Sequence, residues 1–399
     1  MLVSLKPKER IQSLRMTHLS TVLCKDFSYR KSASFLNDVL HRNDDKNEIK
    51  HRTLADNINR LGGEIAASMS QASVNILSAN GFDGETGLPL RDFELPGSIT
   101  GIFDKNKIND GRTEIQSTIE TINKNRYEKI LQRADEIPLE SKNAEDTVYV
   151  SIDEILVKAQ KEVRSPNVTR DSRFVDNAVA HVQYKDKAIS LTATDLNNLF
   201  KSILACLIDN DLLKYHLVFF CDGAKNIRLK IEEMFAFHPY RIVLDWFHIK
   251  KRCRESLSMA IKKQDKRNIV LEEVLRFLWV GNIDGAKVYL NSLDPILIKN
   301  QKRFEDVLCY LENKRPFMTC YAVRKKLFLR NSSNTVEKAN DLLVAQRQKN
   351  NGMAWTLDRS GALASIEMLY RNKQADNFFR TGKFSFAMID VQKDLKEAV

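Results

Sequence analysis

Residues 216–248 read HLVFFCDGAKNIRLKIEEMFAFHPYRIVLDWFH, and this stretch decides the fold class. Its first part, HLVFFCD (216–222), is a continuous apolar run ended by an aspartate, which is typical of a strand buried on both faces. The segment AKNIRLKIEEMFAF (224–237) has helical spacing, and YRIVLDWFH (240–248) is a second buried strand. This alternation of strand and helix predicts an α/β protein.

The residues before this stretch extend the same sheet. TVYVSIDEILV (147–157) alternates apolar and polar residues, and RFVDNAVAHVQY (173–184) and KAISLTAT (187–194) follow as two strands joined by a tight turn at Lys185-Asp186. NNLFKSILACLI (197–208) has helical spacing. The predicted order is therefore three strands, a helix, a strand, a helix and a strand.

Two aspartates stand at positions where a carboxylate is costly. Asp153 lies within the first strand, near the apolar positions Ile152 and Ile155, and Asp222 ends the apolar run LVFFC. A buried carboxylate costs free energy unless it is paired or binds a metal ion. If the first and fourth strands are neighbours, the two carboxylates can face each other and hold two Mg²⁺ ions about 3.5–4 Å apart. Taken singly, each aspartate is better explained as a strand-end cap or a turn residue; the two together in this strand order favour the metal site.

A third carboxylate has two candidates. Asp245 ends the fifth strand, whereas Glu337 opens a later helix, with Asp341 one turn further as a backup ligand. Asp245 and His248 have two possible roles. They either hold the DNA substrate or a water molecule near the metal ions, or they tie the end of the strand to a neighbouring helix. Two cations on the Glu337 helix are placed to hold phosphates: Arg347 and Lys349.

Basic residues cluster beside these carboxylates. A run after the fifth strand favours contacts with a DNA backbone, and two cations after Asp222 are either phosphate contacts or a solvated helix face. Trp355 is suited to stacking on a base, but packing in the core explains it at least as well. The candidate DNA contacts here are Lys225, Arg228, Lys250, Lys251, Arg252, Arg254, Arg347, Lys349 and Trp355.

The N-terminal region reads as helices. Residues 29–40 place apolar residues on one face, a polar turn covers 41–49, and a second helix starts at Lys50 with Gly62-Gly63 as its predicted stop. Two such helices suit a helix-turn-helix DNA reader, with an ordinary helical hairpin as the alternative. The residues expected to reach DNA are Lys50, Arg52, Asn57 and Arg60.

Composition excludes several classes of protein. The 399 residues carry a net charge of +11, which favours a polyanionic partner. No apolar run approaches the roughly 18 residues that a membrane span needs, and the first residues are charged where a signal peptide is apolar. Six scattered cysteines without metal-ligand spacing indicate a reducing compartment. We therefore expect a cytoplasmic protein with no membrane partner.

Four motifs together resemble a known family. YVSIDE (149–154), FFCDGAKNIR (219–228), VLDWFHIKKR (243–252) and SNTVEKANDLLVAQRQKNNGMAW (333–355) are similar to those of bacterial insertion-sequence transposases with a ribonuclease-H-like DDE core. The resemblance covers about residues 147–372. It implies a mixed sheet flanked by helices, an all-helical insertion before the glutamate, and Mg²⁺- or Mn²⁺-dependent DNA cleavage and strand transfer. It assigns the three catalytic, metal-binding carboxylates to Asp153, Asp222 and Glu337.

The resulting hypothesis is a DNA transposase that acts as a homo-oligomer on double-stranded DNA, at element ends and target, in the bacterial nucleoid. The alternatives are a structure-selective DNA nuclease on the same fold, or a non-catalytic helix-turn-helix DNA-binding protein from a decayed element. The expected divisions are a helical DNA-binding domain (1–80), a linker and helix (81–146), the first part of the ribonuclease-H-like core (147–249), the helical insertion (250–329), the Glu-bearing part of the core (330–372) and a C-terminal tail (373–399).

Overall fold

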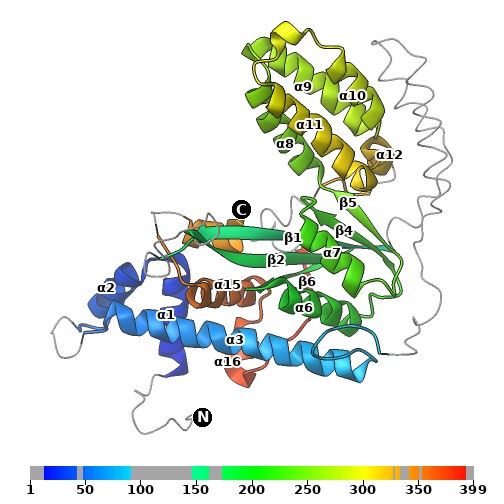
Figure 1. The fold of residues 1–399 in the computed structure, drawn as a ribbon. Coiled ribbons are helices and arrows are strands. Elements are labelled where there is room, and N and C mark those ends of the chain that lie inside the picture. Colours follow the sequence, from blue (N-terminus) through cyan, green and yellow to red (C-terminus); the bar gives the residue numbers. More distant parts are fainter. Residues whose placement is uncertain are drawn as a thin grey trace.

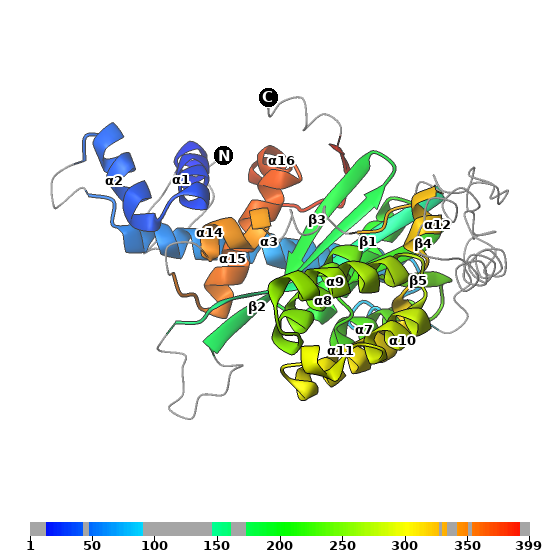
Figure 2. The ribbon, with the colours of Figure 1, turned by 90° about the horizontal axis from the view of Figure 1, so that it is seen from above.

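The structure is an open mixed sheet flanked by helices, with a helical unit standing above one edge of the sheet (Figures 1 and 2). It is a computed structural model. It describes residues 13–42, 48–90, 146–160, 173–326, 329–332, 341–349 and 353–391. The predicted α/β class is confirmed.

The sheet contains six strands in the order β5-β4-β1-β2-β3-β6. Strand β1 is antiparallel to β2 and parallel to β4, so the first and fourth strands are neighbours, as the aspartate pair requires. The strand β4 is parallel to β5, and β3 is antiparallel to both β2 and β6. The bounds are β1 Thr147–Lys158, β2 Phe174–Tyr184, β3 Lys187–Ala193, β4 His216–Cys221, β5 Tyr240–Leu244 and β6 Ile389–Asp390.

The helices between these strands follow the predicted order. Helix α6 (Leu196–Asp209) starts at Asp195, whose side chain accepts a hydrogen bond from the backbone N–H of Asn198. Helix α7 (Lys225–Met234) links β4 to β5. Every residue of β4 is buried, which explains its continuous apolar sequence.

One strand ends earlier than the sequence predicts. Strand β5 stops at Leu244, and helix α8 (Trp246–Ala260) starts where the DWFH motif was expected to continue the strand. Asp245 is the N-cap of α8, because its carboxylate accepts a hydrogen bond of 2.7 Å from the backbone N–H of Phe247. An aspartate cap satisfies an otherwise unpaired N–H group, so it favours helix over strand at this point.

The N-terminal helices differ most from expectation. Helices α1 (Leu14–Asp26) and α2 (Tyr29–Val39) are short, but α3 (His51–Ala79) runs 29 residues straight through the predicted stop at Gly62-Gly63. Gly62 faces helix α15 (Leu357–Arg371), where a Cβ atom would lie 2.2 Å from the carbonyl oxygen of Ala362. The glycine therefore permits a close helix–helix approach instead of ending the helix.

Helix α3 packs against the sheet-covering helices along its length. It contacts α15 and α6, and Figure 1 shows it running beneath both. Its apolar residues Leu54, Ile58 and Ile65 belong to the same buried cluster as β1 and β2. The N-terminal region is thus part of the main core, and the predicted boundary at residue 80 does not separate two hydrophobic cores.

A buried carboxylate joins α1 to α15. Glu367 on α15 is buried, and its carboxylate lies 3.6 Å from the ammonium of Lys25 on α1. Burial raises the pKa of Glu367 to about 7, and the charge of Lys25 opposes that rise. The folded state therefore binds a proton here that the unfolded chain releases near pH 4.5.

This pKa predicts a pH-dependent stability. The stabilisation from a raised carboxylate pKa is complete below about pH 4.5 and is lost as the pH rises through about 7. Relative to Glu367→Gln, the wild-type chain should lose up to about 3 kcal/mol of unfolding free energy between these limits. Urea titrations of both proteins at several pH values measure this difference. A difference that stays constant with pH contradicts the prediction.

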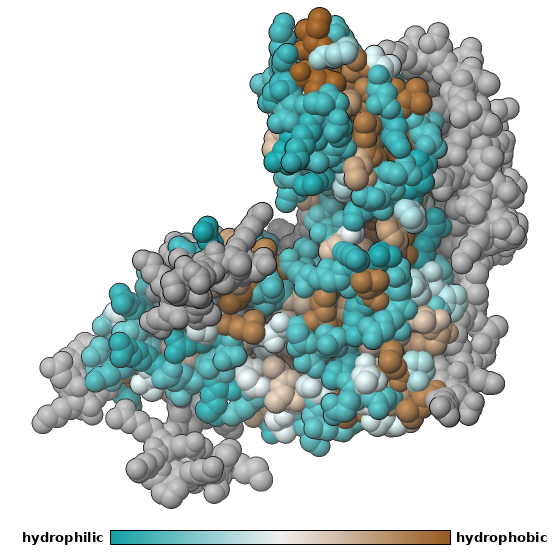
Figure 3. All heavy atoms as spheres, viewed as in Figure 1, coloured by the Kyte–Doolittle hydropathy of each residue, from teal (hydrophilic) through white to brown (hydrophobic). Residues whose placement is uncertain are grey.

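The helical insertion forms a second hydrophobic cluster. It contains α8, α9 (Gln264–Trp279), α10 (Ile283–Asn291), α11 (Gln301–Lys314) and α12 (Tyr321–Lys326), with 3-10 turns at Pro295–Leu297 and Arg315–Phe317. The expected helical character of 250–329 is confirmed for its described residues. Most of the insertion surface visible in Figure 3 is hydrophilic, because its apolar side chains pack inward.

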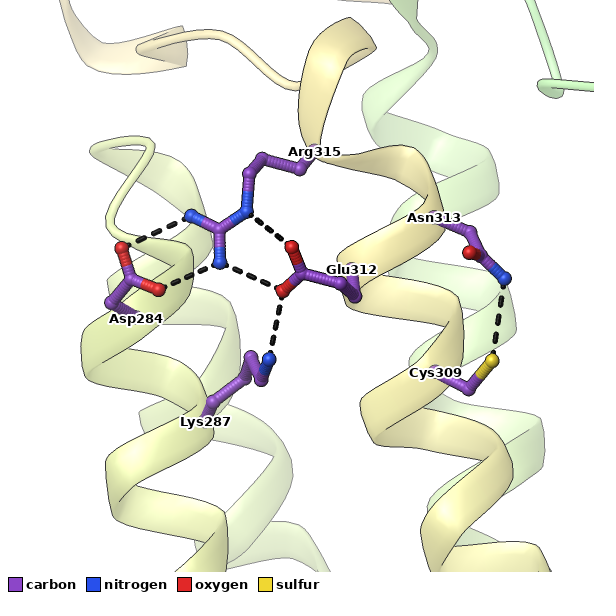
Figure 4. Close-up of polar contacts among 6 residues, drawn as sticks. All are labelled: Asp284, Lys287, Cys309, Glu312, Asn313 and Arg315. Atoms are coloured by element: carbon purple, nitrogen blue, oxygen red, sulfur yellow. Dashed lines mark hydrogen bonds and ion pairs between the residues drawn. The ribbon is translucent and has the colours of Figure 1, made fainter.

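Ion pairs connect α10 with the end of α11 (Figure 4). The guanidinium of Arg315 donates to both oxygens of Asp284 at 2.6 and 3.0 Å and to both oxygens of Glu312 at 2.8 and 2.9 Å. Lys287 donates to Glu312 at 2.7 Å. These hydrogen bonds hold the pKa of Glu312 down at about 2. The network fixes the geometry between α10 and α11 and so keeps the end of α11 in place.

The predicted C-terminal tail is structured over its described part. Helix α16 (Ala375–Thr381) packs into the core through Phe378, and β6 pairs with β3 at the edge of the sheet. Residues 375–390 therefore belong to the main fold, which corrects the expectation of a tail. Over the described ranges, none of the helices is both long enough and apolar enough to cross a membrane.

Candidate metal centre

The structure brings Asp153 and Asp222 to neighbouring positions. The last parallel pair of β1 and β4 joins Ser151 to Phe220, and continuing this register by two residues aligns Asp153 with Asp222. Alternate residues of a strand share a face, so both carboxylates lie on the face of Phe220. That face packs against the insertion, because Phe220 shares a cluster with Ile249 of α8. The two aspartates therefore lie on one face of the sheet, next to α8.

A sharp turn holds the Asp222 carboxylate. Its Oδ1 accepts a hydrogen bond of 2.7 Å from the backbone N–H of Ala224. Gly223 between them has a φ of +85°, a left-handed conformation that favours glycine. The ammonium of Lys314 on α11 donates a hydrogen bond to the Gly223 carbonyl. The helical insertion thus supports the turn that carries Asp222.

The charge of Asp153 is destabilised by its surroundings. Burial, with a smaller contribution from the nearby Asp222 carboxylate, raises the pKa of Asp153 to about 6. His248 on the first turn of α8 opposes the rise, as does a hydrogen bond of 2.9 Å from the backbone N–H of Glu154. A second carboxylate that raises the pKa of a buried one is an electrostatic setting in which a bound cation is stabilised.

Asp245 has a different role from its two neighbours. It is completely buried, and its Oδ1 caps α8 through the N–H of Phe247. This hydrogen bond agrees with the alternative considered above, in which Asp245 ties the end of the strand to a helix. His248, by contrast, lies close enough to Asp153 for its charge to affect that carboxylate.

Glu337 lies outside the described residues, so its position relative to the aspartates stays a prediction. The described residues on either side of it contact α8 and β1. The carbonyl of Asn331 accepts a hydrogen bond of 3.1 Å from the N–H of Trp246 at the start of α8. The π-helical turn η7 (Asp341–Ala345) contacts β1. Asp341 itself is exposed and accepts a hydrogen bond from Gln346 at 3.0 Å.

The donor set fits a hard cation in part. Carboxylate oxygens are the ligands that Mg²⁺ and Mn²⁺ prefer, and burial, with the nearby Asp222 charge, raises the pKa of Asp153. Over the described ranges, no group of three or more His, Cys, Asp and Glu side chains is arranged to hold a metal ion. A complete site therefore needs a ligand beyond the two aspartates.

Most of the predicted basic contacts are accessible. Lys250, Lys251, Arg252 and Arg254 are exposed on α8, and Lys225 is exposed at the start of α7. Arg228 is partly engaged, since it pairs with Glu232 at 2.9 Å and lies over the Phe317 ring. On α3 and its cap, Lys50, Arg52 and Arg60 are exposed, whereas Asn57 is half-buried. Lys349 is also exposed.

Two predicted DNA contacts are core residues instead. Arg347 is 6% exposed, donates to the carbonyl of Cys24 at 3.2 Å, and lies 5.4 Å from the ring centres of both Tyr29 and Trp355. Trp355 is 4% exposed and donates through its indole N–H to the carbonyl of Gln348. Neither side chain can reach a phosphate or a base in this structure. They attach the segment after Glu337 to the N-terminal helices.

Several residues of the site carry no signal in the sequence. Lys314 lies 91 residues from Gly223 in the chain, yet contacts it directly. Glu154 accepts a hydrogen bond of 2.6 Å from Asn226, across 72 residues. Such partners follow from how α7 and α11 pack on the sheet, so no local pattern announces them.

No protein-family model matches the chain, and no curated protein matches it as a relative. The function therefore has to be inferred from the residues and the geometry of the site.

Proposed function

We propose that the chain is a DNA transposase with a ribonuclease-H-like core, which hydrolyses phosphodiester bonds at insertion-sequence ends and joins the freed 3′-hydroxyl to target DNA. The observation that carries this proposal is the placement of Asp153 on β1 and of Asp222 directly after β4, its parallel neighbour. A homo-oligomer is part of the proposal, because two element ends must be joined to one target.

The topology supports the proposal at the level of the fold. The order β5-β4-β1-β2-β3, with β1 antiparallel to β2 and parallel to β4, is compatible with a ribonuclease-H-like sheet. The helical insertion follows β5 and precedes the segment of Glu337. This is the position that the resemblance to insertion-sequence transposases implies.

Asp153, Asp222 and Glu337 would hold the metal ions. When bound, two Mg²⁺ or Mn²⁺ ions activate the attacking oxygen and stabilise the leaving oxygen of a phosphodiester. The chain itself supplies the other functions. His248 partly offsets the negative charge around Asp153, and the cations of α8 are positioned to attract the DNA backbone towards the carboxylates.

A structure-selective nuclease is the second candidate, and one observation favours it. Helix α3 packs on α6 and α15, so the helices of 13–79 do not form a separate end-reading module among the described residues. A nuclease needs the two aspartates but no such module. A non-catalytic DNA-binding protein, in contrast, leaves the aspartate pair without a role.

The test uses the purified chain and linear DNA that ends in the inverted repeats flanking its gene. With Mg²⁺ or Mn²⁺ we expect cleavage at the repeat boundary and joined products with a second DNA, and chelation should abolish both. DNA with scrambled ends is the control. Cleavage of branched DNA regardless of its ends, without joining, indicates the nuclease. Binding of the ends without any cleavage contradicts both enzyme functions.

A further inference from the structure

A pocket of about 340 Å³ opens beside Asp222, between the helical insertion and the sheet. One wall comes from α8 through Lys251 and Arg252, and the other from α11 through Tyr310 and Lys314. The two helices lie side by side above α7 in Figure 1. The pocket is thus continuous with the carboxylate site but built mainly from the insertion.

The charges of this pocket are divided between its two ends. Lys251, Arg252 and Glu255 of α8 line the insertion end, whereas the ammonium of Lys314 bonds to the Gly223 carbonyl beside Asp222. Asp222 lies at the sheet end. An anionic ligand is therefore attracted to the helices and repelled from the bare aspartates, unless those aspartates hold cations.

Arg252 and Tyr310 are arranged for recognition of an anion. The guanidinium of Arg252 lies 5.8 Å from the centre of the Tyr310 ring, which limits its orientations. Burial raises the pKa of Tyr310, so its hydroxyl remains a neutral hydrogen-bond donor. A planar guanidinium and a phenol hydroxyl are common partners of phosphate oxygens.

We propose that this pocket binds a phosphodiester of the cleaved DNA strand that is adjacent to the phosphodiester being cut. The inference rests on the proposed function, and it adds a binding site that includes Tyr310 and Lys314. Arg252 and Lys251 contact the phosphate, while Lys314 fixes the Gly223 turn that forms the boundary with the carboxylates. The insertion thereby aligns the strand with Asp153 and Asp222.

The experiment measures equilibrium binding of a fluorescent DNA end in the presence of EDTA, so that cleavage plays no part. The variants are Arg252→Ala, Arg252→Lys and Tyr310→Phe, with Lys383→Ala as the control. Lys383 is an exposed cation after α16, outside this pocket. Affinity is recorded over a range of salt concentrations, and circular dichroism establishes that each variant is folded.

For Arg252→Ala we expect about a tenfold loss of affinity. The slope of log association constant against log salt concentration, which is negative, should become shallower by about 1. Arg252→Lys should restore most of the slope, because the charge remains, but only part of the affinity. Tyr310→Phe should weaken binding a few-fold with no change of slope, and Lys383→Ala should match the wild type. An unchanged slope in folded Arg252→Ala overturns the proposal.

This measurement separates the pocket from the proposed function. If the wild-type chain never cuts DNA but Arg252→Ala lowers the slope, the phosphate site stands and the transposase proposal fails. If the wild type cuts and joins DNA while Arg252→Ala binds normally, the pocket proposal fails alone. Equal losses of DNA affinity in Arg252→Ala and Lys383→Ala would indicate attraction by the overall positive charge of the protein, which also overturns the proposal of a specific phosphate site.

Discussion

Asp222→Asn is expected to reduce DNA cleavage by about a thousandfold or more, which corresponds to roughly 4 kcal/mol of activation free energy. The substitution keeps the shape of the side chain and its hydrogen bond from Ala224, but removes the negative charge that would hold a cation. Rates are measured in single-turnover assays with Mg²⁺ and Mn²⁺. The same effect is expected for Asp153→Asn, because its carboxylate lies close enough to Asp222 for their charges to interact.

Although Asp222→Asn should cleave DNA more slowly, we expect it to be as stable as the wild type or slightly more stable. Asp222 raises the pKa of Asp153, so removing its charge relieves a repulsion in the metal-free protein. Without metal, Asp222→Asn should melt at the wild-type temperature or slightly above it. Addition of Mn²⁺ should raise the melting temperature of the wild type much more than that of the variant.

A matched control is Asp186→Asn, which removes an exposed carboxylate in the β2–β3 turn. It should cleave DNA at the wild-type rate and respond normally to Mn²⁺. Wild-type cleavage by Asp222→Asn would show that the catalytic centre lies elsewhere in the chain.

The second large effect is expected from Gly62→Ala. Its new Cβ atom would lie 2.2 Å from the carbonyl oxygen of Ala362 and 2.5 Å from the Ala362 Cα. Both are backbone atoms of α15, so the contact can be relieved only by moving one helix away from the other. We expect a loss of about 3 kcal/mol or more in unfolding free energy, at the upper end of what overpacked cores show.

The neighbouring residue provides a sharp control. A Cβ at Gly63 meets no atom within 4 Å, so Gly63→Ala should stabilise the chain by about 0.5–1 kcal/mol through helix propensity. Urea unfolding followed by circular dichroism compares the two variants. Equal stabilities for Gly62→Ala and Gly63→Ala would mean that α3 and α15 do not approach closely in solution. Failure of Gly62→Ala alone to fold is the extreme form of the expected result.

Local patterns predicted the sheet well because its strands have strong signals. The apolar run 216–221 follows from burial of β4 on both faces, whereas 147–157 was predicted from its alternation although the first six residues of β1 are all buried. The same patterns indicated Asp153 and Asp222, since a carboxylate within an apolar strand is conspicuous. Their alignment depended on the strand order, which the structure confirms.

The errors arose where a residue type has two common roles. Glycine ends helices but also allows them to approach, and at Gly62 the packing of α15 decides for the second role. Arginine and tryptophan bind DNA but also fill cores, and Arg347 and Trp355 lie buried against Tyr29. Aspartate ends strands but also caps helices, as Asp245 does for α8.

By itself, the sequence determined the α/β class and the order of the elements in 147–248, and it identified the two aspartates as candidate site residues. Each of these depends on periodicity within a few residues. The tertiary structure alone decided that α3 belongs to the main core and that α8 and α11 form a cationic pocket beside Asp222. These features join residues far apart in the chain. Their free energies come from contacts between packed elements, which no local pattern records.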